Sequence, residues 1–132
     1  MPENIPDSLK YTDTHEWLRK ETDGTVTVGI THHAQDMLGD VVFVQTPAPG
    51  RKAARGSEVG VIESVKAAAD IYAPISGEVV AANEELNDAP EKINEQPYEA
   101  WLFRMKPDDP GDFDTLLDAA KYEKVVEADK EQ

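Results

Sequence analysis

Lys66 is the side chain whose surroundings in the sequence point most clearly to chemistry. It is the only basic residue between Arg55 and Lys92, and that stretch contains eight acidic residues. The three residues that follow it, 67–69, are alanines and leave its amine accessible. A lone exposed amine among small side chains is a group that a modifying enzyme can find. The alternative is an ordinary solvated lysine at a turn. We take Lys66 as the candidate for covalent modification.

The histidines and carboxylates give weaker signals. Adjacent residues on a helix point about 100° apart, so His32 and His33 are not expected to chelate one ion, and no His-x-x-x-His spacing supports them or His15. The chain has no Gly-x-Ser-x-Gly elbow and no glycine-rich phosphate loop. Its many acidic residues show no pairing that indicates a hydrolytic dyad. We therefore expect capping or surface roles for the histidines, no metal site and no catalytic residues.

Two apolar strands must reverse direction at Lys66 for its amine to be presented. Residues 58–64 and 68–74 have the composition of β-strands, and a tight turn at residues 65–67 joins them. This pattern predicts a β-hairpin with Lys66 at its tip. Valine-rich residues 40–46 and 78–82 predict one more strand on each side of the hairpin.

The N-terminal part of the chain predicts a second hairpin and a short helix. Residues 15–20 and 25–30 flank Asp23-Gly24, a pair that supplies the positive φ of a hairpin turn. Thr31 can cap a helix over residues 31–38, and Gly39 can end that helix in a left-handed conformation.

The C-terminal part is less regular. Residues 83–97 are polar and are expected to form a long surface loop, and residues 99–105 predict a last strand. After a break at residues 106–111, apolar residues recur at the spacing of one or two short amphipathic helices, with Asp112 or Asp114 as the cap of the first. The apolar positions are Phe113, Leu116, Leu117, Ala120, Tyr122, Val125 and Val126.

Composition excludes several classes of function. The 132 residues include 13 basic and 27 acidic side chains, a net charge of −14. A protein this acidic is not expected to bind nucleic acid or an anionic membrane surface, both of which require basic groups. The chain has no cysteine, which excludes disulfides, thiolate zinc sites and a cysteine nucleophile. The negative net charge suits binding to a partner that presents basic patches.

The N-terminal residues MPENIPDSLKYT lack a basic start and an apolar core, so we see no signal or transit peptide. No apolar run approaches the ~20 residues that span a bilayer. We expect a cytoplasmic protein. Nothing indicates a dimer seam, and a monomer is expected.

Several separated segments resemble one known family. Residues 59–79 (VGVIESVKAAADIYAPISGEV) are similar to the lipoyl-lysine segment of the glycine cleavage system H-protein family. Residues 11–18 (YTDTHEWL) and 28–35 (VGITHHAQ), with Leu38-Gly39-Asp40 after them, resemble its N-terminal signatures. Residues 94–98 (NEQPY) and Trp101 resemble its C-terminal part. The segments stand in the right order, so the resemblance covers about residues 9–125.

The resemblance implies a fold and a set of site residues. The fold would be mainly β, a barrel-sandwich hybrid of the lipoyl and biotinyl type, with the N-terminal β-hairpin, the short helix near 31–38 and the C-terminal helix or helices. Residues 1–132 would form a single lipoyl-carrier domain with frayed ends. Lipoic acid would be attached covalently to Lys66 as an amide, on an arm that reaches ~14 Å from the backbone. Glu63 would help the lipoate-attaching enzyme recognise the hairpin, and the cleft that shields the loaded arm would contain Thr14, Glu16 and Asp70.

By the same resemblance the chain is not an enzyme but a carrier that other enzymes use as a tethered substrate. It would shuttle the aminomethyl group of glycine between three enzymes. They are a pyridoxal-phosphate glycine decarboxylase, a tetrahydrofolate-dependent aminomethyltransferase and dihydrolipoyl dehydrogenase, which contains FAD. One surface would have to be acceptable to all three.

Other readings of the same hairpin remain open. A biotin carrier normally shows Met-Lys-Met, and a lipoyl domain of a 2-oxoacid dehydrogenase usually has Asp before the lysine; here the segment is Val65-Lys66-Ala67. An H-like protein that relays lipoyl or octanoyl groups to other enzymes would show the same attachment hairpin. An unmodified structural module is the fourth reading.

Overall fold

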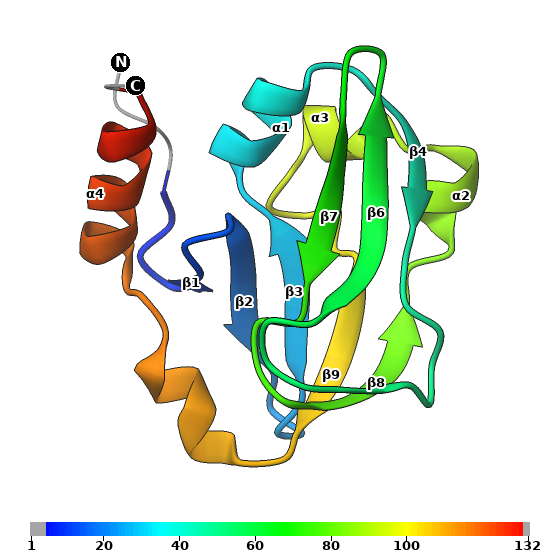
Figure 1. Cartoon of the computed structure of the whole chain (residues 1–132). Helices are drawn as coiled ribbons and strands as arrows, with labels where there is room; N and C mark the ends of the chain where they lie inside the picture. The colour runs from blue at the N-terminus through cyan, green and yellow to red at the C-terminus, as the bar shows by residue number, and fades with distance from the viewer. Residues whose placement is uncertain (1–4, 131–132) are drawn as a thin grey trace.

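Two antiparallel sheets pack face to face in the computed structural model, which describes residues 5–130 (Figure 1). The larger sheet has the order β1-β2-β3-β9-β8-β5 and the smaller has the order β4-β6-β7. The strands of the larger sheet are β1 (Lys10–Tyr11), β2 (Glu16–Lys20), β3 (Val26–Ile30), β9 (Phe103–Pro107), β8 (Gly77–Ala82) and β5 (Lys52–Ala53). Those of the smaller sheet are β4 (Val41–Gln45), β6 (Glu58–Ser64) and β7 (Ala68–Tyr72). The prediction of a mainly β sandwich is confirmed, with two sheets and no closed barrel.

The short helices lie at the ends and edges of the sandwich. They are α1 (His32–Leu38), α2 (Glu85–Asp88), α3 (Lys92–Glu95), a 3₁₀ helix (Pro110–Thr115) and the longer α4 (Ala119–Lys130). Figure 1 shows α4 beside β1 at one side of the molecule. Within residues 5–130 no helix combines the length and the apolar character needed to cross a membrane.

The buried side chains form two clusters. The larger lies between the two sheets and includes Val28 of β3, Ile62 of β6, Ile71 of β7 and Phe103 of β9. Burial of these aliphatic and aromatic groups is the main force that holds the sheets together. The smaller cluster fixes α4 to the N-terminal strands through Tyr11, Trp17, Tyr122, Val126 and Leu9.

The local predictions for the N-terminal half are confirmed. Strands β2 and β3 pair antiparallel, with Glu16 opposite Ile30 at one end and Lys20 opposite Val26 at the other. The Thr31 hydroxyl accepts a hydrogen bond from the Ala34 amide at 3.2 Å and so caps α1. Strands β6 and β7 form the predicted hairpin.

Two predictions for the C-terminal half are wrong. Residues 83–97 do not form a loop throughout, since they contain α2 and α3, each fixed by one buried apolar side chain, Leu86 and Ile93. Strand β9 begins at Phe103 rather than at residue 99, because residues 96–101 fold into turns in which the Ala100 amide donates to the Gln96 carbonyl.

The predicted helix cap is also wrong. Asp109, rather than Asp112 or Asp114, accepts from the Gly111 amide at the start of the 3₁₀ helix. Asp118 accepts from the Lys121 amide at 2.9 Å and caps α4. Each capping aspartate directly precedes its helix, where the unpaired amides of the first turn point.

Candidate functional site

The tip of the β6–β7 hairpin is a tight turn held by Ser64. Its amide donates to the Ala67 carbonyl at 2.7 Å, and its hydroxyl accepts from the amides of Ala67 at 3.0 Å and Lys66 at 3.3 Å. The Val65 amide donates to the Asp40 carbonyl at 3.0 Å, which links the tip to the segment before β4. The small Ser64 side chain therefore fixes the backbone that carries Lys66.

The Lys66 side chain is exposed at this tip. Its stem lies against Gly39, where a Cβ would come within 3.2 Å of Lys66 Cε. Within residues 5–130 no carboxylate forms an ion pair with Lys66 Nζ. Glu63, three residues earlier, is exposed on β6 opposite Ala68. Figure 1 shows the hairpin extending beyond β4, so that its tip stands clear of the sheets.

A cavity of about 350 Å³ lies at the far end of β7 from Lys66. Its walls come from residues 11–14 and 16, from the end of β7 and the two residues after it, from residues 55–56 and from residues 115–117. Thr14 and Glu16 line this cavity, but Asp70 does not. Asp70 precedes Tyr72, a wall residue, by two positions, so the two side chains lie on the same face of β7.

Glu16 is a buried carboxyl in the cavity wall, with 2% of its surface exposed. Both Thr12 and Thr14 donate their hydroxyls to Glu16 Oε1, at 2.6 and 2.5 Å. Burial raises the pKa of Glu16 to about 7, although the two threonine hydroxyls and a backbone hydrogen bond from Tyr72 favour the ionised form. Near neutral pH this carboxyl is therefore close to the midpoint of its titration.

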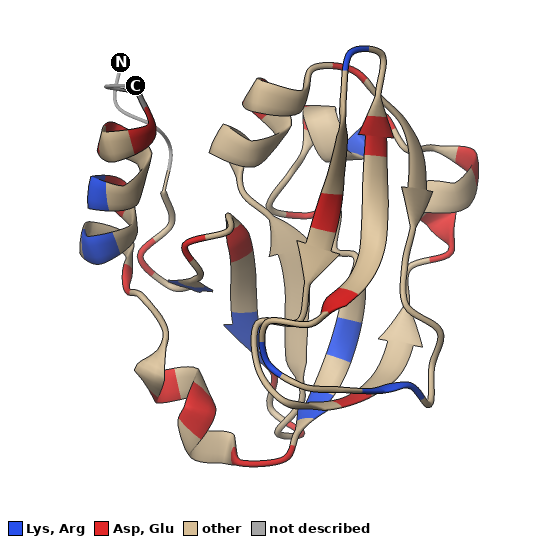
Figure 2. Cartoon of the chain, viewed as in Figure 1, with Lys and Arg blue, Asp and Glu red and all other residues tan. Residues whose placement is uncertain are grey.

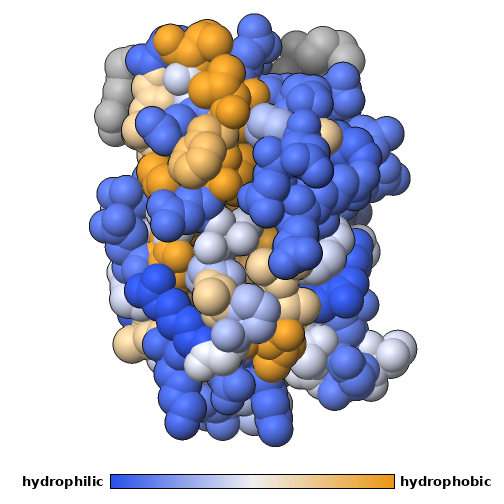
Figure 3. All heavy atoms as spheres, turned by 90° about the vertical axis from the view of Figure 1, so that its right-hand side faces the viewer, coloured by the Kyte–Doolittle hydropathy of each residue, from blue (hydrophilic) through white to orange (hydrophobic). Residues whose placement is uncertain are grey.

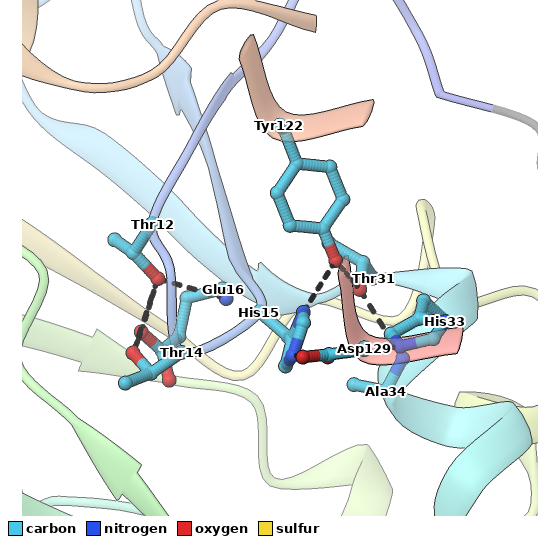
Figure 4. A network of polar contacts seen from close by, with 9 residues as sticks. All are labelled: Thr12, Thr14, His15, Glu16, Thr31, His33, Ala34, Tyr122 and Asp129. Atoms are coloured by element: carbon cyan, nitrogen blue, oxygen red, sulfur yellow. Dashed lines mark hydrogen bonds and ion pairs between the residues drawn. The ribbon is translucent and has the colours of Figure 1, made fainter. Parts of the chain in front are cut away.

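A second polar network begins at His15, the residue before Glu16. His15 is the only non-glycine residue of the described part of the chain with a positive φ, 72°. Figure 4 shows Thr12, Thr14 and Glu16 on one side and the His15 ring on the other, directed toward Tyr122. His15 Nδ1 lies 2.8 Å from Tyr122 Oη, which lies 2.6 Å from Thr31 Oγ1. Burial lowers the pKa of His15, while the neighbouring Asp129 opposes the shift.

The sequence-predicted residues thus fall into two groups joined by β7. Lys66 and Glu63 lie at the tip of the hairpin, and Thr14 and Glu16 lie at the cavity, with Asp70 on the strand between them. Sequence analysis missed Thr12 and Tyr72. Thr12 and Thr14 meet at Glu16 because residues 12–15 form a turn, in which the His15 amide donates to the Thr12 carbonyl at 3.2 Å, and no sequence period marks this arrangement.

The family model described as glycine cleavage H-protein matches residues 9–129. The glycine cleavage system H proteins of Thiobacillus denitrificans and Nitrosospira multiformis are each 61% identical to it over 126 residues, which is 96% of this chain and 98% of each relative. A crystal structure of a glycine cleavage system H protein from Mycobacterium marinum superimposes with a TM-score of 0.82 at 36% identity, and the match covers 96% of this chain and 99% of that one.

Proposed function

Because the chain belongs to the glycine cleavage H-protein family, the lipoyl carriers of the glycine cleavage system, we propose that it bears lipoic acid as an amide on Lys66 Nζ. The observation that carries this assignment is the exposed Lys66 amine, which pairs with no carboxylate within residues 5–130 and stands on the hairpin tip held by Ser64. Bound there, lipoic acid would supply a disulfide that on reduction gives two thiols, one of which can carry the aminomethyl group of glycine. The chain itself is a carrier without catalytic residues of its own.

The surroundings of Lys66 fit such an attachment. Lys66 is exposed, so an attaching enzyme can reach its amine. The amide would form when the neutral amine attacks an activated lipoyl group, the activating group leaves and the amine nitrogen releases a proton to solvent. Hydrogen bonds from the Val65 amide and from the Ser64 amide and hydroxyl hold the turn, so the backbone that carries Lys66 is fixed at the tip. Glu63 offers the enzyme a carboxylate on the same hairpin, and we assign it a recognition role.

We assign the protection of the loaded arm to the cavity and to β7. Counting 3.3 Å per residue, Asp70 lies roughly 13 Å along the hairpin from Lys66 and Tyr72 roughly 20 Å, so the end of a ~14 Å arm laid along β7 reaches Asp70 and faces the mouth of the cavity. Asp70 offers an exposed carboxylate there, and Thr14 and Glu16 line the cavity beyond it. A cationic amine that enters the cavity would favour the ionised form of Glu16, because opposite charges stabilise one another more strongly away from water.

Large apolar side chains are exposed around the tip, and they suit docking of partner enzymes. Met37 of α1, Val42 and Phe43 of β4, and Val65 beside the lysine are all exposed. Figure 3 shows hydrophobic side chains gathered in the upper part of the face that carries β4. Acidic segments outnumber basic ones over the whole chain (Figure 2), which favours partners with basic patches. We assign this surface to glycine decarboxylase, aminomethyltransferase, dihydrolipoyl dehydrogenase and the lipoate-attaching enzyme, each binding a monomer of the chain.

Intact mass of the chain produced with a lipoate-attaching enzyme tests the proposal. The expected result is a gain of one lipoyl group, located to Lys66 by peptide mapping and absent from the Lys66→Arg variant. Lys20→Arg is the matched control, because this exposed lysine lies on β2 and should leave the mass gain unchanged. Modification of Lys66→Arg at the parental level would overturn the assignment.

Exchange of bicarbonate with the carboxyl group of glycine, catalysed by glycine decarboxylase, separates a carrier from a relay. The lipoylated chain should support exchange and Lys66→Arg should not. A chain that is lipoylated but supports no exchange would instead be an H-like protein that relays lipoyl or octanoyl groups to other enzymes.

A further inference from the structure

His15, His33 and Asp129 meet at the junction of β2, α1 and α4, on the other side of the His15 backbone from Glu16 (Figure 4). Asp129 Oδ2 lies 2.8 Å from His15 Nε2 and 3.2 Å from His33 Nε2. The ligand atoms of the three residues all lie within 4.8 Å of one another. Three groups that bind metals, from distant parts of the sequence, therefore converge on one point.

Two of the three spacings between these atoms are close to those of a tetrahedral metal site. Zinc binds histidine nitrogen at about 2.0–2.1 Å and carboxylate oxygen at about 2.0–2.2 Å, so neighbouring ligand atoms of a tetrahedral site are about 3.3 Å apart. The two distances to Asp129 Oδ2 fall within about 0.5 Å of that value. Two imidazoles and one carboxylate are a zinc-binding set that leaves a fourth position for water.

The groups behind His15 can hold it in the metal-binding form. A histidine that binds a metal through Nε2 carries its proton on Nδ1, and that proton needs an acceptor. Tyr122 Oη lies 2.8 Å from His15 Nδ1 and can accept it while donating its own proton to Thr31 Oγ1, 2.6 Å away.

The three side chains differ in how far they are exposed to solvent. The His33 side chain is 6% exposed and the His15 side chain 13%, whereas the Asp129 side chain is 34% exposed. The two histidines therefore form the largely buried inner side of the site. The Asp129 carboxylate on α4 forms its more exposed outer side, from which an ion can enter.

We propose that His15, His33 and Asp129 bind one divalent transition-metal ion, with Zn²⁺ as the best match, and that the ion fastens α4 to the rest of the fold. The sequence predicts no metal site because His32 and His33, which are adjacent in the chain, cannot easily bind one ion together. The structure instead brings His33 to His15, with ring centroids 4.9 Å apart. Without an ion, Asp129 bridges the two imidazoles by hydrogen bonds.

Titration of the untagged, unlipoylated full-length chain with ZnCl₂, followed by calorimetry and by thermal unfolding, tests the proposal. We expect one Zn²⁺ per chain and a rise in Tm, because an ion that binds only the folded state stabilises it. Co²⁺ in its place should give the visible absorption of a tetrahedral site. His33→Gln and Asp129→Asn should each weaken binding at least tenfold.

Two matched variants control for changes elsewhere. His32→Gln removes the neighbouring histidine of α1, and Glu127→Gln removes an exposed carboxylate of α4; both should bind Zn²⁺ as the parent does. Lys66→Arg should also bind normally, which separates this site from the proposed carrier function. A Kd for Zn²⁺ weaker than about 1 mM in the parent, or equal losses in the cluster and control variants, would overturn the proposal.

Discussion

Lys66 lies against Gly39, the residue that ends α1, so closely that a Cβ on Gly39 would stand 3.2 Å from Lys66 Cε. Gly39 has φ 79° and ψ −157°, a combination that is essentially confined to glycine. Its carbonyl also accepts a hydrogen bond from Asn94 Nδ2 at 2.8 Å. The end of α1 thus leaves room for the stem of the lysine.

Gly39→Ala should lower the free energy of unfolding by about 1–3 kcal/mol, because a non-glycine residue is strained at this φ and ψ. It should also slow lipoylation, since the new methyl group displaces the Lys66 stem. Gly24→Ala is the matched control, because Gly24 has φ 90° in the β2–β3 turn and no atom within 4 Å of its Cβ position. Urea unfolding and mass-monitored lipoylation check both effects. An equal loss of lipoylation rate in Gly24→Ala would contradict the role of the contact.

Glu63→Gln should slow lipoylation about tenfold, the factor that corresponds to one charge-assisted hydrogen bond of about 1.4 kcal/mol to the attaching enzyme. Its stability should be unchanged because Glu63 is exposed. Glu58→Gln, at the other end of β6 and also exposed, should react at the parental rate. The initial rates of lipoylation of the two variants, followed by intact mass, test this prediction. A Glu63→Gln rate equal to that of Glu58→Gln would remove Glu63 from the recognition site.

Glu16→Gln should flatten the pH dependence of stability. The pKa of Glu16 is about 7 in the folded chain against 4.5 for an unburied carboxyl, so the folded state binds more protons than the unfolded state between these values. Stability therefore falls as pH rises through this window, and the loss is nearly complete by about pH 8, one unit above the folded pKa. Urea unfolding from pH 4 to 8 should show the parent losing up to about 3 kcal/mol relative to Glu16→Gln. Parallel curves for the two proteins would show that Glu16 titrates normally.

Tyr122→Phe should lower the free energy of unfolding by about 1–3 kcal/mol, because it leaves Thr31 Oγ1 and His15 Nδ1 without their shared partner in a buried place. Tyr11→Phe is the control. Tyr11 stacks on Tyr122 at a centroid distance of 4.7 Å but makes a single, half-buried hydrogen bond to the Pro6 carbonyl. Urea unfolding in the presence of a chelator should show the larger loss for Tyr122→Phe. Equal losses would mean that the network adds nothing to the ring packing.

Features set by neighbouring residues were predictable from the sequence. Asp23-Gly24 specifies the β2–β3 turn, in which Gly24 has φ 90°, and Thr31 caps α1 through its own hydroxyl. The alternating apolar residues on both sides of Lys66 specify its hairpin. In each case the decisive interaction joins residues within a few positions of one another.

Features that depend on distant contacts were not predictable. Leu86 and Ile93 are single apolar residues in a polar segment, and only their packing into the core between the sheets explains α2 and α3. Strand β5 has two residues, too few to show a period, and is defined by its pairing with β8. The approach of Asp129 to His33 joins residues 96 positions apart and leaves no pattern in the sequence.

The separation of the buried side chains into two clusters has a consequence for the motions of the chain. Helix α4 contributes Tyr122 and Val126 to the smaller cluster and nothing to the one between the sheets. Its detachment would therefore be a sub-global opening, and its amide protons should exchange with solvent sooner than those of β3 or β9. The β6–β7 hairpin packs in the cluster between the sheets, so Lys66 should remain presented at its tip while α4, at the side of the molecule, detaches.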